Sequence, residues 1–297
     1  MGLVRLSNEF GSVVITPDAG AALRSLLVKV GGRDYELLAG GGDGTFSEPE
    51  TPQGAGSFIM APWVNRIHRG KLVTDHGEFD LPVDSGEHSI HGTVRRRAWD
   101  VVSESDLAAE MWVQLRAPWP FAGHVVSKVA LDGPSLKQTL EVHAAEGERL
   151  SPAGVGWHPW FRRSLGGAEL QVQADVAKQW ELDAKVVPTG VAAETDGTRK
   201  LRSGGKFGVG EVDGCFLLRE GGTAAVRWPE LTLRMKSSAE VNHVMVYSPA
   251  GAVCVEPQTT TVNAFQLAAR GIADTGTRTV SPGKPLSATT VWSWAGA

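Results

Sequence analysis

The segment Val129-Ala-Leu-Asp-Gly-Pro-Ser-Leu-Lys-Gln-Thr-Leu-Glu-Val142 contains two alternating runs of residues separated by a turn signal. Val129 and Leu131 precede Asp132-Gly133-Pro134, and the positions that share one side after the turn are Leu136, Gln138, Leu140 and Val142. Successive side chains of a strand point to opposite faces, and an Asp-Gly pair favours a tight turn. The segment therefore predicts two antiparallel strands joined as a hairpin.

The same period of two recurs along the chain, in Leu26–Val30, Met111–Leu115, Leu231–Met235 and Val244–Val255. No segment shows a sustained 3.6-residue stripe of the kind that predicts an amphipathic helix. Glycine accounts for 36 of 297 residues, about 12% against a usual roughly 7%, as many tight turns require. We predict an all-β fold, a large antiparallel β-sandwich made of two packed sheets.

At 297 residues the chain is long for one domain, although all-β sandwiches reach this length. The soft stretch Gly40–Pro52 is typical of a surface loop rather than a linker between domains. We therefore expect residues 1–297 to form a single domain.

The formal net charge is −4 and the isoelectric point is about 6.1, with no stripe of basic residues. This composition argues against a nucleic acid or an anionic membrane as partner. The N-terminus lacks the apolar run of a signal peptide, and no stretch reaches the roughly 18 apolar residues of a membrane span. Cys215 and Cys254 fit a reducing compartment. We expect a cytoplasmic protein; the oligomeric state and a bridge between the two cysteines stay open.

Two segments about a hundred residues apart carry the strongest chemical signal, Gly154-Val-Gly-Trp-His158-Pro-Trp-Phe161 and Val255-Glu256-Pro-Gln-Thr259. The aromatic neighbours of His158 suit the apolar face of a sugar ring. Glu256 shares a strand face with Cys254, and Pro257 fixes it at the expected strand end, where partial burial would raise its pKa. Each residue alone is typical of a structural group, but together they can donate and accept a proton on opposite sides of a small molecule.

Further polar positions lie in Asn65-Arg66-Ile67, in His88-Ser-Ile-His91-Gly92 and at Asp213. The histidine spacing lacks the three or four ligands that a zinc site needs, so we expect no metal site. The clusters Arg95–Arg97 and Arg162–Arg163 could clamp a phosphate, although short basic runs are commonly solvated.

In the order NRI, HG, HPWF, VDGCF and VEPQT, these motifs resemble the aldose 1-epimerase (galactose mutarotase-like) family, from about Thr16 to the C-terminus. The resemblance implies a β-supersandwich that interconverts α and β sugar anomers without a cofactor. It also implies that Glu256 is the catalytic base and His158 the catalytic acid. Residues that the resemblance and the aromatic context together assign to sugar binding are Arg66, His91, Asp213, Asn65 and Trp160.

We therefore expect a mutarotase whose partner is a small free hexose, with His158 and Glu256 facing one another across a cleft. One alternative is a hexose-6-phosphate mutarotase, which Gly86–Arg97 also resembles; convergence of either Arg95–Arg97 or Arg162–Arg163 on the pocket would favour it. The other alternative is a non-catalytic carbohydrate-binding β-sandwich, which has no need for both a proton donor and a proton acceptor.

Overall fold

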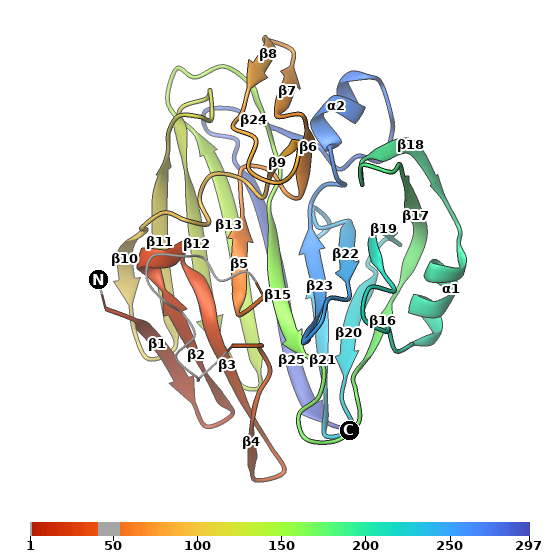
Figure 1. Ribbon diagram of the computed structural model, residues 1–297. Coiled ribbons are helices and arrows are strands. Elements are labelled where there is room, and N and C mark those ends of the chain that lie inside the picture. Colours follow the sequence, from red (N-terminus) through yellow and green to blue (C-terminus); the bar gives the residue numbers. More distant parts are fainter. Residues whose placement is uncertain (1, 41–53) are drawn as a thin grey trace.

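The computed structural model describes residues 2–40 and 54–297. The predicted loop Gly40–Pro52 therefore lies outside the described residues, apart from Gly40 itself. Within that part, strands dominate and helices are short (Figure 1). The strands are β1 (Val4–Asn8), β2 (Gly11–Thr16), β3 (Ala22–Val30), β4 (Arg33–Glu36), β5 (Ser57–Met60), β6 (Arg66–His68), β7 (Lys71–Thr74), β8 (Gly77–Asp80), β9 (His88–Ile90), β10 (Asp100–Glu104), β11 (Ala108–Leu115), β12 (Gly123–Leu131), β13 (Ser135–Ala144), β14 (Ser151–Ala153), β15 (Gly156–Arg162), β16 (Gln171–Ala174), β17 (Val176–Leu182), β18 (Pro188–Ala193), β19 (Asp213–Leu218), β20 (Thr223–Arg227), β21 (Leu231–Ser237), β22 (His243–Tyr247), β23 (Ala252–Gln258), β24 (Arg278–Val280) and β25 (Leu286–Gly296). The helices are η1 (Pro17–Ala19, a 3-10 turn), α1 (Asp196–Ser203) and α2 (Ala264–Ala269).

Two large antiparallel sheets organise these strands. The larger sheet has the order β1-β2-β3-β5-β15-β23-β22-β19-β17-β18, with β4 paired to β3. The smaller has the order β10-β11-β12-β13-β25-β21-β20-β16. The prediction of an all-β fold with large antiparallel sheets is confirmed.

The hairpin predicted from the first segment is β12–β13, in which Leu131 pairs with Leu136 across the Asp-Gly turn. Its inward side chains, such as Val129 and Leu140, join a continuous hydrophobic cluster that also includes Val13 of β2 and Phe161 of β15. The core therefore lies between the two sheets, because each contributes the apolar face of its alternating strands.

The alternation along β15 and β23 separates core from site. Val253 and Val255 belong to the hydrophobic cluster, so Cys254 and Glu256 lie on the opposite face, as predicted. The prediction that Glu256 ends the strand is wrong, because β23 continues through Pro257 to Gln258. The proline is tolerated because regular pairing of β15 with β23 is interrupted between Gly156–Gln258 and Trp160–Cys254.

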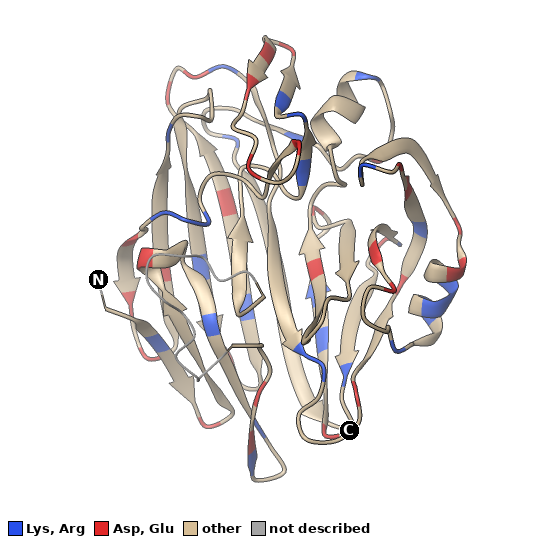
Figure 2. Ribbon diagram, viewed as in Figure 1, with Lys and Arg blue, Asp and Glu red and all other residues tan. Residues whose placement is uncertain are grey.

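The segment between β5 and β10 forms a cover beside this face. It contains the small sheets β6–β9 and β7–β8, and α2 contacts both β6 and β7. Charges of both signs are interspersed along the described chain (Figure 2). Among the described residues, no helix has the length and apolar character needed to cross a bilayer. Cys215 and Cys254 are both buried and unpaired, so the bridge that their spacing left open is not formed.

Candidate active site

One row of side chains across the larger sheet brings the predicted catalytic residues together. Gly156 pairs with Gln258 and Trp160 with Cys254, so His158, two residues from each, lies opposite Glu256. On the other side of β15, His158 pairs with Phe58 of β5. On the other side of β23, Glu256 pairs with Met245 of β22. These side chains share one sheet face and form the first row of a floor.

A second row of side chains lies on the same face of the sheet, two residues further along each strand. Trp160 pairs with Cys254, Cys254 with Tyr247, and Tyr247 with Asp213 of β19. The edge of the Trp160 ring meets Tyr247, with 6.0 Å between ring centroids and an interplanar angle of 82°. Residues from four strands thus meet because their registers coincide.

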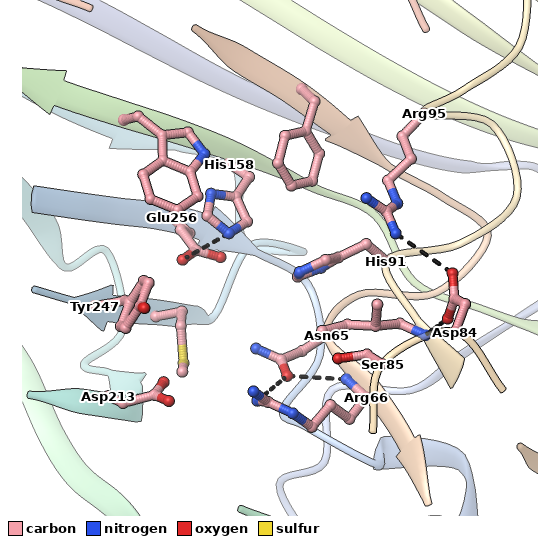
Figure 3. A pocket seen from close by; sticks show the side chains of 14 residues that line it. Asn65, Arg66, Asp84, Ser85, His91, Arg95, His158, Asp213, Tyr247 and Glu256 are labelled. Atoms are coloured by element: carbon pink, nitrogen blue, oxygen red, sulfur yellow. Dashed lines mark hydrogen bonds and ion pairs between the residues drawn. The ribbon is translucent and has the colours of Figure 1, made fainter. Parts of the chain in front are cut away.

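These rows form the floor of a cavity of about 210 Å³, and loops around β6 and β9 form its wall (Figure 3). All seven residues predicted for the site line this cavity. Its lining comprises Phe58, Asn65, Arg66, Asp84, Ser85, Ile90, His91, Arg95, His158, Trp160, Asp213, Met245, Tyr247 and Glu256. Their roles in binding or catalysis stay predictions.

The imidazole of His158 is held between two aromatic rings. It stacks on Phe58 with centroids 4.4 Å apart and on Trp160 with centroids 5.1 Å apart. The guanidinium of Arg95 lies 5.8 Å from the Phe58 centroid, and the edge of His91 meets His158 at 5.1 Å. This packing fixes the plane of the imidazole, which is a requirement for directed proton transfer.

His158 and Glu256 are direct neighbours, contrary to the prediction that they face each other across a cleft. Nε2 of His158 lies 3.4 Å from Oε1 of Glu256, and their side chains are 6% and 2% exposed. The prediction failed because the sequence does not reveal that β15 and β23 are adjacent. A substrate must therefore contact both groups from the same side.

Burial displaces the pKa of both groups toward their neutral forms. Desolvation lowers the pKa of His158 to about 3, with a smaller contribution from the charge of Arg95, and a backbone hydrogen bond opposes it. Desolvation, followed by the charge of Asp213, raises the pKa of Glu256 well above its usual value, while Arg66 opposes the shift. Burial therefore favours a neutral imidazole beside a protonated carboxyl group.

Arg66 enters the cavity from the wall and is positioned by Asn65. The amide oxygen of Asn65 accepts hydrogen bonds from the backbone N–H of Arg66 at 2.9 Å and from its Nη1 at 3.1 Å. Asn65 has φ of 50°, a left-handed conformation that Asn tolerates better than most residues. Asn65 thus orients the guanidinium as well as lining the cavity itself.

His91-Gly92 forms a close backbone approach. His91 has φ of 62°, its N–H donates to the carbonyl of Asn65 at 3.0 Å, and its Nδ1 lies 2.9 Å from the sulfur of Met60. A Cβ on Gly92 would lie 1.8 Å from the carbonyl oxygen of Ala61, so only glycine fits there. Burial, followed by His158 and the nearby arginines, lowers the pKa of His91 well below its usual value.

Of the two arginine clusters, only Arg95 lines the cavity, where its Nη2 lies 3.4 Å from Oδ2 of Asp84. Arg163 instead donates to the backbone carbonyls of Phe207 and Pro249, and Arg162 donates to the carbonyl of Leu38. These two arginines anchor the end of β15. The Arg95–Arg97 cluster therefore reaches the cavity through Arg95, whereas Arg162 and Arg163 do not line it.

Sequence reasoning missed Phe58, Asp84 and Tyr247 as cavity residues. Tyr247 follows the alternation of Val244 and Val246 and falls on their opposite face, but only the sheet order shows what that face meets. A grouping of ligand atoms was also missed: those of His158, Cys254 and Glu256 lie within 4.8 Å of one another.

Comparisons with known proteins identify the family to which the chain belongs. The family described as aldose 1-epimerase matches residues 2–293, and the chain belongs to this family. It is similar to the uncharacterized proteins YphB (28% identity over 42% of each chain) and YihR (23% over 70% of each) of Escherichia coli K12. The match therefore spans less than half the length of YphB.

Solved structures share the fold. A galactose mutarotase-like protein from Clostridium acetobutylicum superposes with a TM-score of 0.84 at 20% identity, over 99% of this chain and 95% of that one. An aldose epimerase homologue from C. elegans has a TM-score of 0.84 at 17% identity, covering 100% and 99%. Galactose 1-epimerase from Lactobacillus acidophilus has a TM-score of 0.76 at 16% identity, covering 99% and 94%.

Proposed function

We propose that this protein is an aldose 1-epimerase that interconverts the α and β anomers of a free hexose. The observation that carries the proposal is the contact of His158 with Glu256 on the floor of a cavity with aromatic and polar walls. A proton donor and a proton acceptor within reach of one sugar carbon are what ring opening requires. Membership of the aldose 1-epimerase family supports the same reaction.

The pair holds one proton in the pH range between its two shifted pKa values, and that proton can reside on either partner across 3.4 Å. In the proposed step, Glu256 as carboxylate accepts the proton of the C1 hydroxyl, and Nε2–H of His158 donates to the ring oxygen. The bond between C1 and the ring oxygen breaks, and the open aldehyde forms. Rotation about C1–C2 exposes the other carbonyl face, and the reverse transfers close the ring.

The remaining cavity residues suit recognition of hydroxyls away from C1. Arg66 and His91 line the wall and Asp213 lies at the far end of the second row (Figure 3). Trp160 offers an aromatic surface for the apolar face of the ring. The protein exchanges only protons with the sugar, and the C1–oxygen bond breaks and re-forms without a change of oxidation state, so we expect the reaction to need no cofactor. We propose the cytoplasm as its location.

The surroundings of Arg95 favour a free hexose over a hexose 6-phosphate. Phosphate recognition by arginine works best with an unpaired, bidentate guanidinium, whereas Arg95 is paired with Asp84 and stacked on Phe58. The carboxylate of Asp84 would also repel a phosphate.

Polarimetry tests the proposal. Freshly dissolved α-glucose and α-galactose should reach anomeric equilibrium faster with the protein than without it, and glucose 6-phosphate should be a poorer substrate. Sugar binding without any acceleration of mutarotation would identify a carbohydrate-binding β-sandwich instead.

A further inference from the structure

We propose that His158, Cys254 and Glu256 form a three-ligand site for a borderline-soft divalent cation such as Zn²⁺, and that the bound cation inhibits the enzyme. The binding part is independent of the proposed function, whereas the inhibition rests on it. The site arises from strand pairing: Cys254 and Glu256 are alternate residues on one face of β23, and His158 lies opposite Glu256 on β15.

The positions of the ligand atoms suit a tetrahedral ion. Two ligands at the roughly 2.0–2.1 Å typical of zinc–nitrogen and zinc–oxygen bonds lie about 3.4 Å apart in a tetrahedron. Nε2 of His158 and Oε1 of Glu256 are 3.4 Å apart. The third ligand atom, the sulfur of Cys254, is within 4.8 Å of both. In a zinc tetrahedron a thiolate sulfur lies about 3.5 Å from a nitrogen or oxygen ligand, so binding of the ion would draw the Cys254 sulfur closer to the other two ligand atoms.

The charges of this ligand set also favour a divalent ion. One thiolate and one carboxylate neutralise two positive charges, so the filled site places no net charge in a buried environment. The combination of sulfur, nitrogen and oxygen ligands selects zinc-like metals over magnesium or calcium.

The fourth corner faces the cavity, since His158 and Glu256 line it and Cys254 lies beneath, fully buried. Water or a sugar hydroxyl can complete the coordination there. One oxygen of Glu256, Oε2, has no hydrogen-bond partner among the described residues. The site is therefore accessible from the substrate side, and its occupant engages the same lone pairs that proton transfer uses.

Binding requires that Cys254 and Glu256 lose their protons, which pass to solvent as the metal–sulfur and metal–oxygen bonds form. Metal affinity should consequently increase with pH.

Titration of the intact protein with Co²⁺ tests the binding directly. We expect one equivalent to give a sulfur-to-cobalt charge-transfer band in the ultraviolet, and Zn²⁺ to displace it. In Cys254→Ser the band should disappear and the affinity for Zn²⁺ should fall by more than about 10-fold, since loss of even an outer-shell partner costs roughly 10–100-fold.

Cys215→Ser is the matched control, because Cys215 is the other buried free thiol and lies on β19, two strands from Glu256. It should keep the band. Glu256→Gln, which retains the thiol, should weaken Co²⁺ binding and serves if Cys254→Ser does not fold. The absence of a band in the wild type, or its persistence in Cys254→Ser and loss in Cys215→Ser, would overturn the site.

The mutarotation assay then tests inhibition. One equivalent of Zn²⁺ should abolish the wild-type acceleration, Mg²⁺ should not, and a chelator should restore it. The ratio of rates with and without Zn²⁺ is compared within each variant. A Co²⁺ band without any mutarotase activity would leave the metal site standing and refute the proposed function; activity without a band, or unaffected by bound Zn²⁺, would refute the inference alone.

Discussion

The imidazole of His158 and the carboxyl group of Glu256 meet across two neighbouring strands, with Nε2 3.4 Å from Oε1. This contact couples the titration of the two groups, so apparent pKa values belong to the pair. Burial favours neutral His158 and protonated Glu256, and the zwitterionic form needed for the proposed step has the same number of protons. In the proposed step, the bound sugar therefore needs only to change which of the two residues holds the proton, and no proton from solvent is required.

Replacing the carboxyl group should separate catalysis from binding. Glu256→Gln keeps the size and hydrogen-bonding capacity of the side chain but cannot accept a proton. We expect mutarotation to fall about 10²–10⁴-fold, the typical contribution of a positioned base, while sugar affinity changes little. Polarimetry and calorimetric binding measure the two quantities, and Glu141→Gln, on the smaller sheet, is the control. A wild-type rate in Glu256→Gln would assign the base to another group.

The pH profile should lack the usual signature of histidine. Because the pKa of His158 is lowered to about 3, we expect kcat/KM to stay level as the pH falls from about 7 to about 5, across the ordinary pKa of histidine near 6.5. Activity should decrease on the alkaline side, where the pair loses its single proton through the raised pKa of Glu256. A decrease of kcat/KM on acidification, centred near the ordinary pKa of histidine, would contradict the lowered pKa of His158.

Asp84 should control discrimination against phosphorylated sugars. Asp84→Asn removes the carboxylate beside Arg95, so the cavity loses a negative charge that would repel a phosphate. We expect the ratio of kcat/KM for glucose 6-phosphate to that for glucose to rise by at least about 10-fold, and the gain to fade with salt. Arg96→Ala is the control, since Arg96 does not line this cavity. An unchanged ratio would show that Arg95 does not reach the substrate.

The His158–Glu256 pair should also affect how the free energy of unfolding depends on pH in the acidic range. Between about pH 4.5 and 6.5, the unfolded state holds a proton on His158 and none on Glu256. In the folded state, burial shifts both groups the other way, toward a neutral imidazole and a protonated carboxyl group. The lowered pKa makes stability fall on acidification and the raised pKa makes it rise, so the two slopes cancel. Glu256→Gln removes only the contribution of Glu256, which makes stability rise on acidification.

Urea unfolding of Glu256→Gln should therefore show stability decreasing more steeply on acidification than in the wild type, by up to about 1.4 kcal/mol per pH unit. His243→Gln should change the slope in the opposite direction, because His243 is buried with its pKa lowered to about 3 and has no such partner carboxyl group. Equal slopes in all three proteins would refute this account of the coupled pair.

The strands were predictable from local patterns, whereas their neighbours were not. Leu131 and Leu136 flank a turn signal, so the β12–β13 hairpin follows from the sequence. Helices α1 and α2 have eight and six residues, too few to produce a sustained helical period, and were missed. That the whole chain forms one domain stays a prediction.

The site residues came from motif order, and their geometry required the sheet. Arg66 and His91 lie in short motifs, and only the resemblance to the family indicated that these motifs belong to the site. The pairing of β15 with β23 links segments about a hundred residues apart. It brings the ligand atoms of His158 and Cys254 within 4.8 Å of each other. No local pattern specifies that pairing, because it depends on which strands fill the positions between them.

Under the proposed function, the pairing of Gly156 with Gln258 and of Trp160 with Cys254 makes mutarotase activity a measure of correct folding. If β23 slipped by one residue against β15, Glu256 would turn into the hydrophobic interior and Val255 would take its place on the floor. Such a misfolded species would retain its strand content and spectroscopic signature but would turn over no sugar. Recovery of mutarotation during refolding would thus measure the fraction of molecules that have reached native register, a distinction that circular dichroism cannot make.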